Sequence, residues 1–458
     1  MKTIKLADKK NSAVEMVKDA LAAAKKYEEY HMFVSLQGEQ ALERAAEIDA
    51  QIARGESVGR LAGVPFVIKD NMSTRVGATT ASSHMLEPYD APITATCVKR
   101  LVDEGAIVIG RTNLDSFAHG GSTENSYFGP TLNSRDKKRV SGGSSGGSAV
   151  SVALGVVPFA LGSDTGGSIR QPASFNGVYG IKPTYGTVSR YGVVPMASST
   201  DTIGCFASTA GDVDLVMSIL SGRDEKDMTT LDDFWTAPAK KTKKIGVIRD
   251  LMTEDVDAEV RENVNKYIKK LEKAGYEIGE ISMPMLKYSL AVYYIVTPAE
   301  IASNLSRHDG IRYGLRSKKS GTLNELYGRT RDEGFMDENK RRIMVGNFVL
   351  SSGFFDAYYL KAQKARTLLI QSYNDAFKQY DVLVCPVAPT PAFKLGENTD
   401  DPMKMYLADA LTVAPSMAGL PALAVPAGET KSGLTVGAQL IGPRRSDAEL
   451  VRLAGELE

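Results

Sequence analysis

Cysteine and histidine are scarce in this sequence. Three cysteines and four histidines occur among 458 residues, and no two cysteines stand in a short Cys-x-x-Cys spacing. This spacing excludes a disulfide framework and a thiolate zinc site, so we expect no metal centre. Unpaired thiols are typical of a reducing compartment, and the opening MKTIKLADKK lacks the apolar stretch of a secretory signal. We therefore expect a cytoplasmic protein.

The sequence also lacks net charge and a long apolar run. Lys plus Arg and Asp plus Glu each number 55, so no overall field favours nucleic acid or an anionic membrane. The longest nearly apolar run, 149–162, contains Ser151 and Pro158. It is shorter than the roughly 20 residues that span a bilayer. The apolar content of 43% is near the globular average, which excludes a disordered chain. A partner would have to supply most of any RNA contact.

Short apolar runs alternate with helical patterns along the chain. Buried strands are predicted at 63–68, 106–109, 244–248, 382–387 and 422–425. Helices are predicted from Ser12, which can cap the first, and at 39–53, 95–104, 257–274 and much of 286–372. This alternation is typical of the α/β class with a largely buried sheet.

We expect one domain over residues 1–458. It comprises N-terminal helices in 1–60, a core in 61–233 that carries the candidate catalytic residues, and the rest of the sheet with further helices in 245–458. The polar, Lys-rich segment 234–244 is interpreted as a surface connection, and it could instead mark a domain boundary. Strand-like runs on both sides of it favour one continuous sheet.

The segment 141–148, SGGSSGGS, consists only of glycine and serine. Such a string can be a flexible linker. Here it continues into AVSVALGVVPFALG, which predicts a buried helix or strand, whereas a linker leads to the surface. Because no Gly-Lys-Ser/Thr follows, a phosphate-binding loop is not indicated. The string offers the hydroxyls of Ser144, Ser145 and Ser148.

A second glycine-rich string, GSDTGGSIRQP over 162–172, places Ser168 after two glycines. Glycine lets a substrate carbonyl approach backbone N–H groups closely. Donors at Thr165, Gly166 and Gly167, with Ser168 itself, could form an oxyanion hole. The alternative is an ordinary glycine-rich turn.

A serine nucleophile needs a base. His119 stands in a glycine-rich stretch, but nothing in the sequence pairs it with Ser168. Lys69 ends the apolar run VPFVI, where burial would lower the pKa of its amine and leave it able to accept a proton. The alternative is a lysine that pairs with Asp70 or extends to water.

Three segments together, GVPFVIKDN, GGSSGGSA and SDTGGSIRQPA, resemble the amidase-signature family. The resemblance runs from about residue 36 to 443. It implies a mixed, largely buried central β-sheet flanked by helices on both faces, and a Ser-cisSer-Lys triad. By position, Ser168 matches the nucleophile, Ser144 the bridging serine after a cis peptide, and Lys69 the base.

Within this family, KPTYGTVSRYG, SNLSRHDGIRYG, KRRIMVGNFVLSSGFFDAYY and DDPMKMYLADALT are similar to the glutamine-hydrolysing subunits of tRNA-dependent amidotransferases. The resemblance implies that Arg342 binds the α-carboxylate of glutamine and Asp409 its α-ammonium. Tyr293 is a weaker match to a pocket residue. From the residues alone, Arg342 could be a surface arginine of the run 340–342, and Asp409 a helix cap.

The resemblance also implies a heterotrimeric carbon–nitrogen ligase. A B-type subunit would use ATP and Mg²⁺, bind the misacylated tRNA and receive ammonia, and a C-type subunit would wrap this chain. No cofactor is expected in this chain itself. The product would be Gln-tRNA(Gln), or Asn-tRNA(Asn) by the parallel route. The alternatives are a stand-alone amidase with another amide substrate and an inactive scaffold subunit.

The sequence departs from its nearest resemblance at a few positions. Cys205, the pair Ser134-Arg135 and Ser141 replace residues that are Pro, Pro-Trp and Pro in such subunits. These positions flank the predicted triad rather than form it. We expect them to affect loop rigidity and partner docking before chemistry.

Overall fold

The apolar spacing of the sequence is reproduced in its helices and strands. The computed structural model describes residues 2–235, 241–319 and 321–458. The helices are α1 Ala13–Lys26, α2 Gly38–Ala53, α3 Thr96–Asp103, α4 Gly146–Ala153, α5 Arg170–Asn176, α6 Ala210–Leu220, α7 Ala258–Lys273, α8 Ser289–Leu305, α9 Leu323–Gly334, α10 Asp337–Leu350, α11 Lys361–Ala376, α12 Pro402–Leu407, α13 Val413–Met417 and α14 Asp447–Gly455. The strands are β1 Phe33–Leu36, β2 Pro65–Lys69, β3 Ile107–Thr112, β4 Phe159–Asp164, β5 Tyr179–Lys182, β6 Thr202–Ala207, β7 Lys244–Ile248, β8 Glu277–Ile281, β9 Val382–Pro386, β10 Ala422–Glu429 and β11 Thr435–Ile441.

Helix α1 illustrates how the sequence sets these elements. The Ser12 hydroxyl accepts a hydrogen bond from the Glu15 main-chain N–H at 3.5 Å, which satisfies one free donor at the helix start. Ala13, Val17 and Ala20 recur at helical spacing on the buried face. The predicted cap is therefore present.

The strands of the described chain form one mixed sheet with the order β1-β3-β2-β4-β6-β5-β10-β11-β9-β7-β8. β3, β2 and β4 run parallel to one another, and so do β9, β7 and β8. The strands between these groups pair antiparallel. Because β2 and β4 are parallel neighbours, their carboxyl ends meet at one edge of the sheet, and both glycine-rich strings start or end there.

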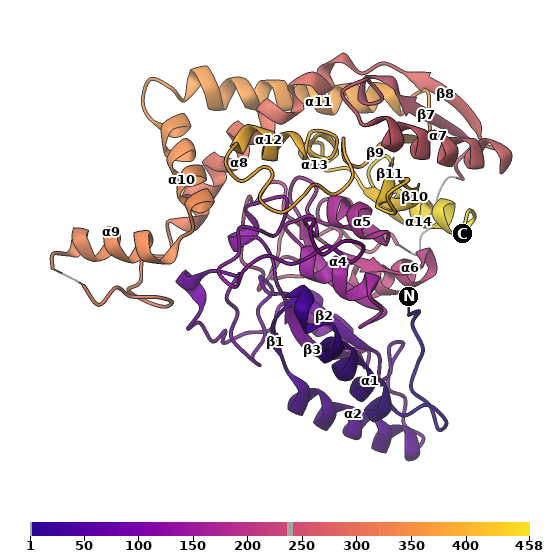
Figure 1. The fold of residues 1–458 in the computed structure, drawn as a ribbon, viewed down its shortest axis with the longest axis vertical. Coiled ribbons are helices and arrows are strands. Elements are labelled where there is room, and N and C mark those ends of the chain that lie inside the picture. The colour runs from indigo at the N-terminus through magenta and orange to yellow at the C-terminus, as the bar shows by residue number, and fades with distance from the viewer. Residues whose placement is uncertain (1, 236–240, 320) are drawn as a thin grey trace.

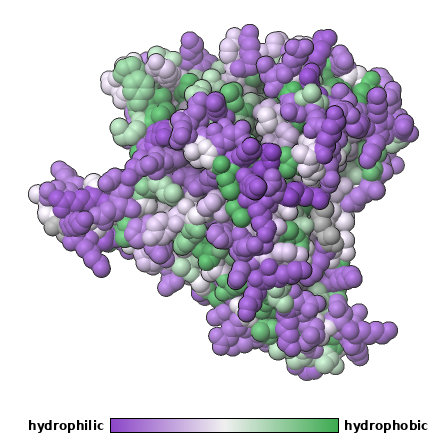
Figure 2. All heavy atoms as spheres, viewed as in Figure 1, coloured by the Kyte–Doolittle hydropathy of each residue, from purple (hydrophilic) through white to green (hydrophobic). Residues whose placement is uncertain are grey.

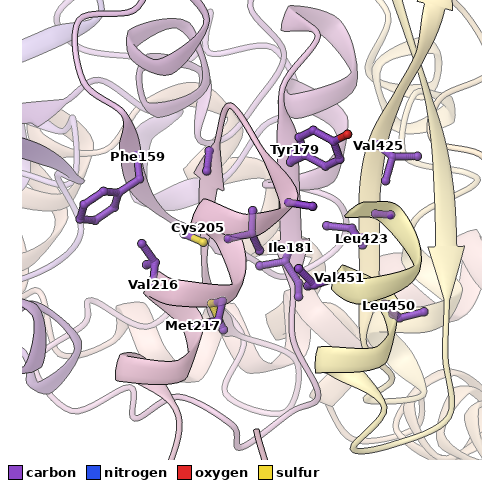
Figure 3. Close-up of a cluster of buried hydrophobic side chains, with 14 of the residues drawn as sticks. Phe159, Tyr179, Ile181, Cys205, Val216, Met217, Leu423, Val425, Leu450 and Val451 are labelled. Atoms are coloured by element: carbon purple, nitrogen blue, oxygen red, sulfur yellow. The ribbon is translucent and has the colours of Figure 1, made fainter. Parts of the chain in front are cut away.

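Helices cover both faces of this sheet, which confirms the predicted fold class (Figure 1). One face packs against α3, α6, α7 and α14 in a continuous core. Figure 3 shows part of it, where Ile181 and Leu423 of neighbouring strands face Met217 of α6 and Val451 of α14. The other face packs against α1, α2, α4 and α5 in the N-terminal half and against α8, α11 and α13 in the C-terminal half.

One expectation needs correction, and another is tested only at its ends. Residues 1–60 contain α1 and α2 but also the strand β1, which pairs antiparallel with β3 at the sheet edge. Of the expected surface connection 234–244, residues 236–240 lie outside the described residues. Trp235 at its start is buried, and its indole N–H donates to Asp214 at 2.8 Å, so this end is anchored rather than free.

The surface is largely hydrophilic, as the charge content predicts (Figure 2). An apolar area stands out over the connection between α10 and α11, where Phe348, Phe354 and Tyr358 are exposed and contact one another. No helix in the described part of the chain combines the length and the apolar character needed to cross a membrane.

Candidate active site

Lys69 ends β2 inside the protein. Its side chain is completely buried, and Nζ lies 2.7 Å from Ser144 Oγ and 3.0 Å from Ser163 Oγ. The alternative of an ion pair with Asp70 is wrong, because the Asp70 carboxylate instead faces the Arg111 guanidinium at 3.4 Å. Lys69 also does not extend to water. The sheet edge thus places an amine directly against the glycine-serine string.

Burial lowers the pKa of Lys69 to about 7, even though the carboxylates of Asp115, Asp164 and Asp201 oppose the shift. An exposed lysine would remain charged at this pH. A substantial fraction of Lys69 is therefore neutral near pH 7 and able to accept a proton. The nearer of the two hydroxyls beside it belongs to Ser144.

The glycine-serine string is buried and ordered by its neighbours, so the linker interpretation is wrong. The peptide bond between Gly143 and Ser144 is cis, as the resemblance implies. The Gly143 N–H donates to Gln171 Oε1 at 2.9 Å, and the Ser144 carbonyl accepts from the Asp115 N–H at 3.3 Å. A Cβ at Gly143 would lie 2.1 Å from an Asp115 oxygen, so only glycine fits there.

Ser168 lies on the loop between β4 and α5 and is 8% exposed. The Ser145 N–H donates to the Ser168 carbonyl at 3.2 Å, which joins this loop to the first string. Gly167 has φ of +150°, and a Cβ on it would lie 2.3 Å from the Thr412 hydroxyl. The loop therefore requires glycine at this position, as the oxyanion-hole hypothesis expects.

Side chains of neighbouring elements hold the loop that contains the other candidate oxyanion residues, Thr165 and Gly166. The Thr165 hydroxyl donates to Asp201 at 2.8 Å, and the Thr412 hydroxyl donates to the Gly166 carbonyl at 2.6 Å. Tyr293 of α8 packs on the same loop. The contact is so close that a Cβ at Gly166 would lie 2.6 Å from the Tyr293 hydroxyl. Tyr293, which the sequence matched only weakly to a pocket residue, thus contacts the loop that carries Ser168.

Arg342 is not a surface arginine. It points inward from α10 with 3% exposure, whereas Arg341 beside it is on the outer side. Its Nε donates to Glu338 Oε1 at 2.8 Å, and its guanidinium lies over the Tyr294 and Tyr406 rings. Burial opposes the charge, but the Glu338 carboxylate and the neighbouring tyrosine hydroxyls together outweigh it, so the pKa of Arg342 lies well above its usual value.

Asp409 follows α12 and lies near Arg342. Its carboxylate accepts a hydrogen bond from the Tyr294 hydroxyl at 3.1 Å, so the helix-cap interpretation is wrong. Burial raises the pKa of Asp409 to about 7, and the charge of Arg342 opposes this shift. A cation that enters this pocket would restore the ionised form.

Among the described residues, no hydrogen bond joins the His119 ring to Ser168. Its Nδ1 is 2.8 Å from the side-chain nitrogen of Asn339, and Asn339 Oδ1 accepts from the Met336 N–H, so Nδ1 of the ring is the acceptor. Burial lowers the pKa of His119 well below its usual value, and the ring stays neutral. Within the described residues, no group of His, Cys, Asp and Glu could hold a metal ion.

Several residues of the site escaped the sequence analysis. Ser163 of β4 accepts a hydrogen bond from Lys69. Its position directly before DTGGS was the feature of the sequence that could have pointed to it. Glu338 precedes Arg342 by one helical turn, the spacing of an intrahelical ion pair. Tyr294 and Tyr406 stack with ring centroids 3.9 Å apart, although they are far apart in the sequence. The candidate catalytic residues all precede the 234–244 segment, whereas Arg342, Asp409 and these tyrosines follow it.

The positions that depart from the resemblance are accommodated. Cys205 is buried in β6 within the main core. Asn176 links the other two, since its oxygen accepts from the Ser134 N–H at 3.0 Å and its nitrogen donates to the Ser141 carbonyl at 2.7 Å. Hydrogen bonds thus order these loops where proline would have stiffened them.

The chain matches a family model described as Amidase over residues 15–451. It is 50% identical to the A-type subunit of the glutamyl-tRNA(Gln) amidotransferase of a Cyanothece species, over 95% of this chain and 92% of that protein. The protein of the same name from Carboxydothermus hydrogenoformans is 49% identical over 100% of this chain and 95% of its own. A crystal structure of the Thermotoga maritima protein of that name superposes with a TM-score of 0.79 at 38% identity, covering 99% of this chain and 95% of that one.

Proposed function

Because the chain belongs to the amidase family, we propose that it releases ammonia from the side-chain amide of glutamine, as the glutaminase subunit of a tRNA-dependent amidotransferase. Relatives about as long as this chain and half identical to it carry that name. They favour this function over a stand-alone amidase. The observation that carries the proposal is the presence of a buried arginine, Arg342, and a buried carboxyl group, Asp409, near the loop that carries Ser168.

The proposed reaction begins with neutral Lys69. It draws a proton from Ser144, which in turn takes the proton of Ser168, and Ser168 attacks the amide carbon. A hydroxyl can relay a proton because it both donates and accepts. The 2.7 Å separation between Lys69 Nζ and Ser144 Oγ supports the first transfer.

The oxyanion of the tetrahedral intermediate would accept hydrogen bonds from the main-chain N–H groups of Thr165, Gly166 and Gly167. Ammonia leaves with a proton returned along the same relay. Water then attacks the γ-glutamyl ester on Ser168 and releases glutamate. The sequence of steps needs no cofactor in this chain.

Free glutamine is a zwitterion, so its recognition needs a cation and an anion at a fixed separation. Arg342 would bind the α-carboxylate through its guanidinium, and Asp409 would bind the α-ammonium. Tyr293 connects this pocket with the chemistry, because it packs on the Gly166 loop while its neighbour Tyr294 binds Asp409.

The protein works in a complex with the other amidotransferase subunits. In our proposal a B-type subunit binds the misacylated tRNA and uses ATP and Mg²⁺, and a C-type subunit wraps this chain. The zero net charge agrees with tRNA contacts that lie mainly on a partner. The exposed aromatic side chains between α10 and α11 support docking of another protein.

Replacement of the nucleophile tests the proposal. Ser168→Ala should lower ammonia release from glutamine by several orders of magnitude, since the acyl-enzyme cannot form. Ser151→Ala is the matched control, because Ser151 is a buried serine of α4 whose hydroxyl, among the described residues, hydrogen-bonds only the Ser148 carbonyl. Glutaminase activity that survives in Ser168→Ala would refute the assignment.

Substrate identity has a separate test. Arg342→Ala should raise the KM for glutamine strongly, and broad activity on aliphatic amides with an unchanged KM for glutamine would instead indicate the stand-alone amidase.

A further inference from the structure

Glu338, Tyr294 and Tyr406 connect the two charged residues of the proposed glutamine pocket. They come from α10, α8 and α12, and all three are partly buried. No step of the reaction requires any of them. Their contacts nevertheless form one continuous chain from Arg342 to Asp409.

The chain begins at Glu338. Its Oε1 accepts hydrogen bonds from Arg342 Nε at 2.8 Å and from the Tyr406 hydroxyl at 3.0 Å. Arginine carries five N–H donors in a planar fork. Within the described residues Arg342 donates only through Nε, so both terminal nitrogens remain for a ligand. Glu338 thus orients the guanidinium without occupying the face that would bind a carboxylate.

The chain continues through the two tyrosine rings. They stack at 3.9 Å with an interplanar angle of 22°, and the guanidinium of Arg342 lies 5.3 Å from one centroid and 5.6 Å from the other. A cation at this distance from aromatic rings is attracted to them. Each ring is rigid, so its hydroxyl can move only if the whole side chain moves.

The hydroxyls of the stacked rings donate to two different carboxyl groups. Tyr406 donates to Glu338, which holds the cation, and Tyr294 donates to Asp409 Oδ2 at 3.1 Å. The second oxygen of Asp409 faces Gly121, where a Cβ would lie 3.4 Å from Oδ1. A Cβ there would be in ordinary van der Waals contact with Oδ1, so glycine keeps the space beside this oxygen free of a side chain.

We propose that the Tyr294–Tyr406 stack and Glu338 form a spacer that fixes the separation of Arg342 and Asp409. The pocket thereby selects amides that carry a carboxylate and an ammonium on one carbon. Glu338, Tyr294 and Tyr406 are positioning and specificity-determining residues. The inference rests on the proposed function, because it takes Arg342 and Asp409 as the residues that bind the substrate.

The spacer is tested by binding and by steady-state kinetics in the full chain assembled with its partner subunits. Dissociation constants for glutamine are measured in the Ser168→Ala background, where no turnover interferes. Glu338→Gln should weaken glutamine binding about tenfold, because a neutral amide holds Arg342 less firmly than a carboxylate does. Tyr406→Phe keeps the stack and removes one hydroxyl, and should weaken binding by about fivefold.

Three readouts separate a spacer from a merely structural role. With Ser168 intact, KM for glutamine should rise while kcat changes less than about threefold, since the triad is untouched. The preference for glutamine over glutaric acid monoamide, which lacks the ammonium, should shrink in Tyr294→Phe. The melting temperature should stay close to that of Tyr359→Phe, a control whose hydroxyl bonds Gln363 outside the pocket.

The results distinguish failure of the spacer from failure of the proposed function. If Arg342→Ala binds glutamine like the parent, the proposed function falls and the spacer with it. If Arg342→Ala loses binding but Glu338→Gln and Tyr406→Phe bind like Tyr359→Phe, the spacer alone is refuted. A parallel fall of kcat and melting temperature in those two variants would also refute it, because that is the signature of general destabilisation.

Discussion

At the scale of single residues, the buried amine of Lys69 makes the reaction rate depend on pH. Its pKa is lowered to about 7 by burial, and in the proposed relay only the neutral amine can accept the proton of Ser144. We expect kcat for ammonia release to rise with pH through about 7 and to level off above it. Below the midpoint kcat should fall about tenfold per pH unit. A profile that stays flat down to pH 5 would show that Lys69 is not the base.

Asp409 predicts a second pH effect, on binding rather than on turnover. Burial raises the pKa of its carboxyl to about 7, and only the ionised form attracts an ammonium. The KM for glutamine should therefore rise as pH falls below 7. Bound glutamine stabilises the ionised form, so kcat at saturation reports Lys69 alone.

Asp409→Asn is the control for this effect. The variant should have a high KM that no longer varies between pH 6 and 8. A KM that still rises in acid would assign the titration to another group.

At the scale of elements, the contact between α10 and α8 sets the position of Arg342. Gly346 lies one turn after Arg342, and a Cβ on it would lie 2.0 Å from the Pro298 carbonyl of α8. Gly346→Ala should force the two helices apart and cost about 1–3 kcal/mol of stability. Because Arg342 moves with α10, the KM for glutamine should rise as well.

Gly328→Ala is the matched control, since α9 has open space around Gly328. There the change should stabilise the protein slightly, because alanine favours the helix. Thermal unfolding and glutamine kinetics on both variants check the pair, and equal behaviour of the two would contradict a role for the helix contact.

Elements with a clear period were predictable from the sequence, and short or composite ones were not. The run before Lys69 predicts β2, and the spacing of apolar residues predicts α7. β1 has four half-exposed residues between two helices, too few for a period, and its hydrogen bonds come from β3. Such a strand is set by the partner and not by its own residues.

The same distinction applies to the site. Lys69, Ser144 and Ser168 stand in strings whose composition is unusual enough to be recognised. Tyr406 and Glu338 are ordinary helical residues whose roles arise only when α12 meets α10. The low pKa of Lys69 is also a property of its surroundings, because burial is decided by the whole fold.

At the scale of the whole molecule, one buried ion pair joins distant parts of the chain. Arg170 pairs with Asp164 at 2.8 Å, and it also donates to the Thr412 carbonyl and to Gln439 Oε1 of β11. Both charged side chains are fully buried. Arg170→Met would leave Asp164 charged and unpaired, and should lower the free energy of unfolding by about 3–5 kcal/mol.

The exposed pair between Arg223 and Asp232 is the comparison for this prediction. These side chains are 65% and 83% exposed, so Arg223→Met should leave stability unchanged within error. Urea unfolding followed by circular dichroism measures both variants. Equal midpoints for the two would show that the buried pair does not hold the two halves of the sheet together.

The positions of the two groups of site residues along the chain have a consequence for how the enzyme could evolve. The residues of the proposed relay precede the 234–244 segment, and the proposed substrate-binding residues follow it. Mutations in the later portion can change which amide is accepted while the earlier portion still performs the same cleavage. An ancestral enzyme with this arrangement could acquire new amide substrates while it kept the same catalytic mechanism.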